Sequence, residues 1–139
     1  MKTRQELVAI ALAHAESESG NDIELTLSTL EPDPLYELQP VGRVLRGMPA
    51  ARRYYEHFFA SFRPRVRGFE LRSEWVTDEG VGQEYVITLA MPDGGDERHH
   101  VIGILTFGKE ALSGERVYAS DRFIRLLTGP MFDELEPMT

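Results

Sequence analysis

Cysteine is absent from the 139-residue sequence. Without thiols, the chain can form no disulfide, no thiolate nucleophile and no cysteine-ligated metal site. No apolar run approaches the roughly 18 residues that a membrane-spanning helix needs. The amphipathic N-terminal segment also lacks the continuous apolar centre of a signal peptide. We therefore expect a cytoplasmic protein that does not bind a membrane.

Positive charge is scarce: the sequence has 15 lysine and arginine residues and 23 acidic residues, which gives a net charge of −8. Binding of nucleic acid requires a concentrated basic face, so no nucleic-acid partner is expected. The sequence also lacks a glycine-rich phosphate loop, a cluster with metal-ligand spacing and a Ser-His-Asp arrangement. We expect no metal and no cofactor. The length predicts one domain, over residues 1–139, with a core of its own.

The first half of the chain has the signals of three helices. Thr3-x-x-Glu6 is a capping box, and Gly20 ends the helix that it opens. One face of this helix carries Leu7, Ile10, Ala11 and His14. A short helix capped by Asn21 follows, then prolines that break helical structure and a hairpin over residues 35–46. A third helix is expected to begin at Gly47-Met48-Pro49. Its buried face carries Ala51, Tyr55, Phe58, Phe59 and Phe62.

The second half of the chain reads as strands. Four strand-like segments cover residues 66–78, 81–91, 98–108 and 115–120, separated by short turns rich in glycine and aspartate. Strands joined by such turns form an antiparallel meander. A short helix over residues 121–127 follows. The acidic tail from residue 131 onwards is expected to lie on the surface.

Two strand patterns indicate what the sheet faces. Alternation in the first of these strands places Phe69, Leu71, Ser73 and Trp75 on one face. Residues 101–107 are apolar on both faces, which indicates a strand covered on both sides. The helices cover one face of this strand, and a second copy of the chain is the simplest element to cover the other face. We therefore predict a homodimer packed through the outer face of the sheet.

This order of elements resembles the nuclear transport factor 2-like superfamily. The segment SGNDIELTLSTLEPD is similar to the family's connection from the first helices to the first strand, and Gly47 with ARRYYEHFFASF is similar to its third helix. The segment GERVYASDRFIRLLTG resembles the closing strand and helix of the SnoaL-like polyketide cyclase and ketosteroid isomerase-like branch. The resemblance implies an α+β cone, a curved antiparallel sheet wrapped by three N-terminal helices (cystatin-like), around a pocket. It does not imply one activity, because this cone serves enzymes and binding modules alike.

The resemblance also assigns candidate catalytic positions. The oxyanion-hole tyrosine of ketosteroid isomerases falls near His14, which can donate a hydrogen bond to an oxyanion. Their catalytic aspartate corresponds to the pair Glu37-Leu38 in this chain. Glu37 lies one residue away from the matching position, and a shift of one residue turns a side chain to the other face of a strand. Their second aspartate falls near Gly103, where no acid is present, so steroid isomerisation is not expected. SnoaL-like cyclases place an acid/base aspartate at the end of the last strand, and Asp121 occupies about that position.

Each catalytic candidate has a structural alternative. His14 is either a packed core histidine or a hydrogen-bond donor to the pocket. Asp121 is either an acid/base or the cap of the last helix. Glu84 is either a buried base with a raised pKa or the partner of Arg72 or Arg98 on a neighbouring strand.

The expected ligand-binding residues are mostly aromatic. Aromatic side chains with one polar end suit the wall of an amphipathic ligand site. His99 and His100 are adjacent on a strand and point to opposite faces, so only one of them can face the pocket. The candidates are Tyr36, Tyr55, Trp75, Tyr118 and His99.

Two functions follow from these residues. The first is a small-molecule-binding domain with an enclosed apolar pocket for an apolar or amphipathic ligand. The alternative is a cofactor-free isomerase or cyclase, in which Asp121 or Glu84 moves a proton α to a carbonyl and His14 stabilises the enolate.

Overall fold

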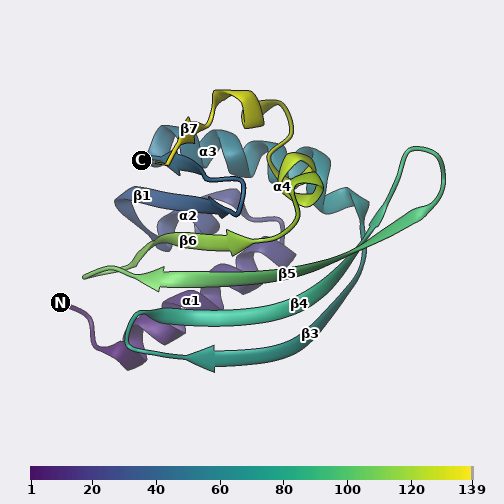
Figure 1. Ribbon diagram of the computed structural model, residues 1–139. Coiled ribbons are helices and arrows are strands. Elements are labelled where there is room, and N and C mark those ends of the chain that lie inside the picture. The colour runs from purple at the N-terminus through teal and green to yellow at the C-terminus, as the bar shows by residue number, and fades with distance from the viewer. Residues whose placement is uncertain (139) are drawn as a thin grey trace.

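The computed structural model describes residues 1–138 and contains one curved sheet with helices packed against it (Figure 1). The helices are α1 (Arg4–Ser19), α2 (Ile23–Ser28), α3 (Met48–His57) and α4 (Asp121–Thr128). A π-helical turn (Phe58–Phe62) and a 3₁₀ turn (Arg63–Arg65) extend α3. The strands are β1 (Leu30–Gln39), β2 (Arg43–Arg46), β3 (Val66–Val76), β4 (Gly80–Ala90), β5 (Asp96–Phe107), β6 (Leu112–Tyr118) and β7 (Glu136–Pro137).

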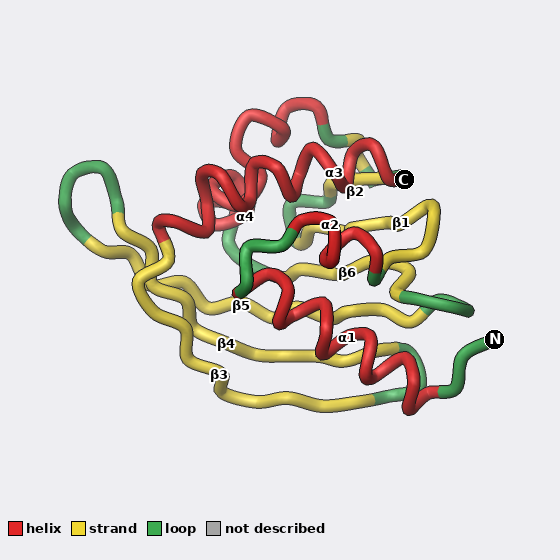
Figure 2. The backbone as a smooth tube through the Cα atoms, turned by 180° about the vertical axis from the view of Figure 1, so that it is seen from behind, coloured by secondary structure: helices red, strands yellow, loops and turns green. Residues whose placement is uncertain are grey.

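The strands of the described residues form one open sheet in the order β3-β4-β5-β6-β1-β2-β7. Strands β3 to β6 are the predicted antiparallel meander, and the β1–β2 hairpin joins it because β1 lies parallel to β6. Helices α1, α2 and α3 lie on one side of the sheet, as the reverse view in Figure 2 shows. The expected α+β cone is confirmed.

The helix termini follow the local sequence. The capping box of α1 is formed, with the Glu6 backbone N–H donating to Thr3 Oγ1 and the Thr3 N–H donating to Glu6 Oε1, both at 3.1 Å. The cap of α2 differs from the prediction: Asp22 rather than Asn21 caps it, accepting from the Leu25 N–H at 3.0 Å. Gly47 precedes α3 with φ of +91°, a conformation that favours glycine.

The core lies between the helices and the concave face of the sheet. The predicted face of α3 is buried there: Ala51 and Tyr55 are completely buried, and Phe58 and Phe62 nearly so. On α1, Leu7, Ala11 and His14 are buried. Apolar side chains of β1, β4, β5 and β6 complete this core. The helical periodicity therefore identified the buried face of both long helices.

The predicted faces of β3 are wrong in its second half. Phe69 and Leu71 pair with Ile87 and Tyr85 of β4, but an irregularity between Leu71 and Ser73 shifts the register. After it, Trp75 pairs with Gly82, and its indole ring occupies the space that a Cβ on that glycine would fill. A bulge reverses the faces of the residues that follow it. Trp75 therefore lies on the convex face, away from the helices.

The expectation for the C-terminal tail is also wrong. Met131, Phe132 and Leu135 are buried, and β7 pairs with β2. The guanidinium groups of Arg43 and Arg125 lie over the Phe132 ring, 5.3 and 4.0 Å from its centroid. The apolar residues of the tail thus cover one end of the core. No helix within residues 1–138 is long and apolar enough to cross a membrane.

Strand β5 presents different residues on its two faces. Val101 faces the helices and is buried, whereas Ile102 on the convex face is 37% exposed. Tyr118, its partner on β6, is 41% exposed. Apolar side chains on the outer face are therefore uncovered in the single chain. The homodimer stays a prediction.

Candidate functional site

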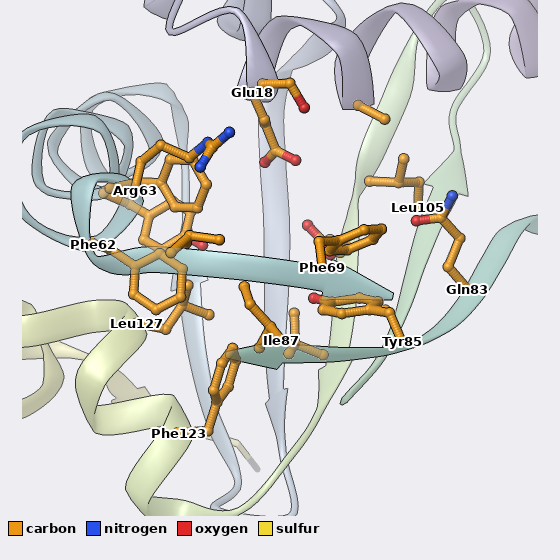
Figure 3. Close-up of a pocket in the computed structure, with 18 of the residues that line it drawn as sticks. Glu18, Phe62, Arg63, Phe69, Gln83, Tyr85, Ile87, Leu105, Phe123 and Leu127 are labelled. Carbon is orange, nitrogen blue, oxygen red and sulfur yellow. The ribbon is translucent and has the colours of Figure 1, made fainter. Parts of the chain in front are cut away.

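A cavity of about 260 Å³ lies between α1, the end of α3, strands β3 to β6, and α4. Its wall is mostly aromatic and aliphatic. Figure 3 shows Phe62 and Leu127 on one side of the cavity, and Phe69 and Tyr85 on the other. This volume suits a small organic molecule, and the lining is typical of a site that binds one.

Glu115 is the acid on the sheet side of this cavity. It lies on β6 on the same face as Val117, opposite Leu105 of β5 and Tyr36 of β1. A Cβ at Gly103 would lie 3.0 Å from Glu115 Oε2, so the glycine leaves room for the carboxyl group. The pKa of Glu115 is raised to about 8, mainly by burial and secondly by the nearby Glu18 carboxylate, whose effect exceeds the opposing effect of His14. Glu115 is therefore mainly protonated at neutral pH and can donate a hydrogen bond.

Glu18 is the second acid of the cavity, and it comes from α1. It lies one helical turn after His14, and its Oε2 is 3.5 Å from His14 Nε2. Burial disfavours the charged imidazole, but the charge of the Glu18 carboxylate and its contact with the ring contribute most to outweighing this, so the pKa of His14 lies above its usual value. The cavity thus combines a neutral carboxyl group with a carboxylate that is paired to a buried histidine.

The hydrogen bonds around His14 place a proton on its Nδ1 atom. The Thr29 hydroxyl donates to the Thr26 carbonyl at 2.6 Å, so its oxygen must accept a hydrogen bond from His14 Nδ1, 2.7 Å away. Nδ1 therefore carries a proton. On the other side of the ring, Nε2 is 3.1 Å from the Tyr55 hydroxyl, which is 2.6 Å from the Tyr36 hydroxyl. This chain of polar groups holds His14 in place behind the cavity.

Two further polar side chains face the cavity from β4. Gln83 lines it while its amide donates to Glu74 Oε2 at 2.6 Å. Tyr85 packs against Phe69, with ring centroids 4.9 Å apart, and lies close to Gly103. Burial raises the pKa of Tyr85 above its usual value, so its hydroxyl stays neutral. Tyr85 therefore offers a hydrogen-bond donor near Glu115.

Three of the predicted site residues form the layer behind the cavity. His14, Tyr36 and Tyr55 are buried and hydrogen-bonded in series, and none of them lines the cavity itself. Tyr54, the neighbour of Tyr55, lines it instead. His14 is thus a core histidine with satisfied hydrogen bonds that lies next to the cavity acid Glu18, and its role as a donor to a ligand stays a prediction.

His99 faces inward, as alternation with His100 requires, but it lies beside the cavity. Its Nε2 is 3.0 Å from Glu97 Oε1, and its ring centroid is 5.3 Å from that of Phe123. Phe123 lines the cavity, whereas His99 does not. His100 is exposed on the convex face.

Asp121 lies away from the cavity. Its carboxylate is exposed and accepts a hydrogen bond from Arg125 Nε at 2.8 Å. The cap of α4 is Ser120, whose Oγ accepts from the Phe123 N–H at 3.1 Å. Both proposed roles of Asp121 therefore belong elsewhere: capping to its neighbour Ser120, and cavity acid to Glu115.

Glu84, Trp75 and Tyr118 also lie away from the cavity, on the convex face of the sheet. Glu84 alternates with the cavity residues Gln83 and Tyr85 and so points the other way, opposite Ile102 of β5. Tyr118 pairs with the same Ile102. These three residues cannot reach a ligand in the cavity.

The sequence interpretation missed the two acids of the cavity, although each left a signal. Glu18 continues the buried stripe of α1, four residues after His14 and seven after Ala11. Glu115 alternates in phase with the apolar residues Val117 and Ala119. An acid on the apolar face of a strand is unusual and marks a functional position.

Within residues 1–138, no group of three or more histidine and acidic side chains could hold a metal ion. The site is organised around two carboxyl groups and a histidine. Such a set can bind a polar group of a ligand and exchange protons with it.

The comparisons with known proteins concern the fold. No protein-family model and no curated protein matches the sequence. Among solved structures, a putative SnoaL-like polyketide cyclase from Jannaschia sp. CCS1 superimposes with a TM-score of 0.69 at 14% identity, over 91% of this chain and 94% of that one. The chain has the nuclear transport factor 2-like fold.

Other solved structures of this nuclear transport factor 2-like fold are also similar in structure at low sequence identity. A nuclear transport factor 2-like protein of unknown function from Cytophaga hutchinsonii gives a TM-score of 0.67 at 9% identity, over 82% of this chain and 99% of that one. An epoxide hydrolase/cyclase-like enzyme, SalBIII, has a role in pyran ring formation in the polyether salinomycin. It gives a TM-score of 0.69 at 16% identity, over 88% of this chain and 96% of that one. At such identities the similarity establishes the fold alone.

Proposed function

We propose that this protein binds a small, largely apolar molecule in the cavity beneath α1 and α3. The observation that carries the proposal is a buried carboxyl group, Glu115, on the wall of an otherwise mostly apolar cavity, where burial raises its pKa. The apolar wall provides the driving force for binding through burial of ligand surface. Glu115 and Tyr85 provide hydrogen bonds that orient a ligand oxygen. A buried acid without a ligand costs stability, which is a common feature of functional sites.

A thermal-shift screen of small organic molecules at pH 6.5 tests this binding. We expect hits to raise the melting temperature, because a ligand that binds the folded state stabilises it by mass action. Ala15→Phe places a ring in the cavity from α1 and is expected to abolish the shifts. Ala9→Phe, at an exposed position of the same helix, is the control and should preserve them. Hits that stabilise the Ala15→Phe protein equally would place binding elsewhere and contradict the proposal.

A second candidate function is catalysis of proton transfer on the bound molecule. It is favoured by the juxtaposition of Glu115, which is neutral, and Glu18, which is paired with His14. In this scheme Glu115 donates a proton to a ligand oxygen while the Glu18 carboxylate accepts one from carbon or from a nucleophilic hydroxyl group. Isomerisation or ring closure needs such an acid and base together. Among proteins of this fold, the epoxide hydrolase/cyclase-like enzyme is a precedent for chemistry of this class.

Hydrogen exchange in deuterated water tests catalysis separately from binding. The protein is incubated with cavity ligands that carry a carbonyl group, and loss of the α-proton signal is followed by NMR. We expect exchange in the unaltered protein, and its loss in Glu18→Gln and Glu115→Gln. If compounds that bind exchange no faster with the protein than in buffer, the catalytic function is contradicted and the binding function still stands.

The homodimer and the cytoplasmic location belong to the proposal as well. The dimer is supported by the exposed Ile102 and Tyr118 on the convex face of the sheet. Because the cavity lies on the other side of the sheet, dimerisation through this face would leave the cavity free.

A further inference from the structure

Arg63 is the cationic side chain among the residues that line the cavity. It lies in the 3₁₀ turn that follows the π-helical turn at the end of α3, and it is half-buried. In Figure 3 its guanidinium group lies toward the same end of the cavity as the carboxylate of Glu18. Within residues 1–138, however, this group has no hydrogen-bond or ion-pair partner.

The two arginines that follow Arg63 in the same segment both have partners. Arg65 Nε donates to the Ala90 carbonyl at 3.1 Å, and Arg67 Nε lies 3.1 Å from Asp96 Oδ1. All three arginines belong to the short segment RPRVR. Two of them therefore hold the turn and β3 in place, whereas the third presents its charge to the cavity.

Among the described residues, neither acid of the cavity wall forms an ion pair with Arg63. Glu115 is held neutral, and Glu18 is next to the imidazole of His14. The guanidinium of Arg63 stays charged at every accessible pH. A cation at the edge of an apolar cavity is partly removed from water, and an anionic group bound there would recover that cost through charge-assisted hydrogen bonds.

We propose that the ligand is a small organic monoanion, whose carboxylate or similar group binds Arg63 while its apolar body fills the cavity. The inference rests on the proposed binding function and specifies the class of ligand. A carboxylate matches the fork of the guanidinium group with two parallel hydrogen bonds. The apolar body then extends along Phe62 and Phe69 toward Glu115.

A matched pair of probes tests this inference. 4-Phenylbutyrate and 4-phenylbutanol have the same apolar body and differ in the carboxylate, and their binding is measured by calorimetry at pH 6.5. We expect the acid to bind about tenfold more tightly than the alcohol, the factor expected for one charge-assisted hydrogen bond. Arg63→Met keeps an apolar stem of similar length and should bring the acid-to-alcohol ratio close to one. Arg67→Met, in the same segment, is the control and should leave the ratio unchanged.

The outcomes separate this inference from the function on which it rests. Equal affinity of the unaltered protein for acid and alcohol would overturn the inference and leave the binding function standing. A preference for the acid that persists in the Arg63→Met protein would likewise overturn the inference and leave the binding function standing. Binding of neither compound would also overturn it, while the screen that includes neutral molecules tests the binding function on its own. Because the ratio is measured within one protein, a general loss of stability in a variant does not imitate the expected result.

Discussion

Replacing Glu115 by glutamine is expected to change how stability depends on pH. Glutamine keeps the size and hydrogen-bonding groups of the protonated carboxyl group but cannot ionise. In the unaltered protein, the folded state holds the Glu115 proton up to a pKa of about 8, whereas the unfolded chain loses it near 4.5. Between these values the folded state binds one more proton, so the free energy of unfolding falls as pH rises. The contribution is complete below pH 4.5 and is lost as the pH passes through about 8.

The size of the effect follows from the two pKa values. Each pH unit changes the free energy by about 1.4 kcal/mol, so the interval from 4.5 to about 8 corresponds to about 5 kcal/mol at most. In proteins, structural relaxation and water penetration around a buried charge reduce this cost. We therefore expect Glu115→Gln to equal the unaltered protein at about pH 4 and to exceed its stability by roughly 2–3 kcal/mol at pH 8.5.

Urea unfolding at a series of pH values measures this difference. Glu16→Gln is the matched control, because Glu16 is an exposed glutamate of α1. The control should follow the pH dependence of the unaltered protein. Identical pH profiles for Glu115→Gln and the unaltered protein would show that Glu115 ionises like a solvated carboxyl group, and would refute the reasoning about the cavity.

Three further variants test other parts of the structure. His14→Ala leaves buried hydroxyl groups without a partner and a gap behind the cavity, so urea unfolding should show a loss of about 3 kcal/mol; a loss under 1 kcal/mol would argue against the buried network. Gly103→Ala places a methyl group 3.0 Å from Glu115 Oε2 and should weaken binding of cavity ligands in calorimetry, whereas unchanged affinity would show that the ligand does not approach this acid. Ile102→Asp puts a charge on the convex face of β5 and should convert a dimer to a monomer in size-exclusion chromatography with light scattering; a monomer before the change would contradict the predicted dimer.

The parts of the fold that depend on neighbouring residues could be predicted from the sequence. The capping box at Thr3 and Glu6, the proline and glycine at the start of α3, and the turns between β3, β4, β5 and β6 act within a few residues. The helical stripe that buries His14 is similarly local. Together with the resemblance of whole segments, these signals were sufficient for the fold class and the order of elements.

The wrong predictions concern residues whose structure depends on contacts with residues distant in the sequence. The bulge in β3 that moves Trp75 to the convex face depends on pairing with β4. Ser120 and Asp121 are both good cap residues, and the sequence cannot tell which of two neighbours adopts the extended conformation. The cavity acids Glu18 and Glu115 come from opposite ends of the chain, and their approach follows from the packing of α1 over β6. A search for acids in phase with buried apolar residues would have found both.

The central claim is that a small molecule binds in the cavity beside Glu115. Two-dimensional NMR of the ¹⁵N-labelled protein, titrated with hits from the thermal-shift screen, tests this claim most directly. We predict that the largest shifts of amide signals cluster at cavity residues, such as Tyr54, Gln83, Gly103 and Phe123. Shifts confined to the convex face of the sheet, around Ile102 and Tyr118, would contradict the claim.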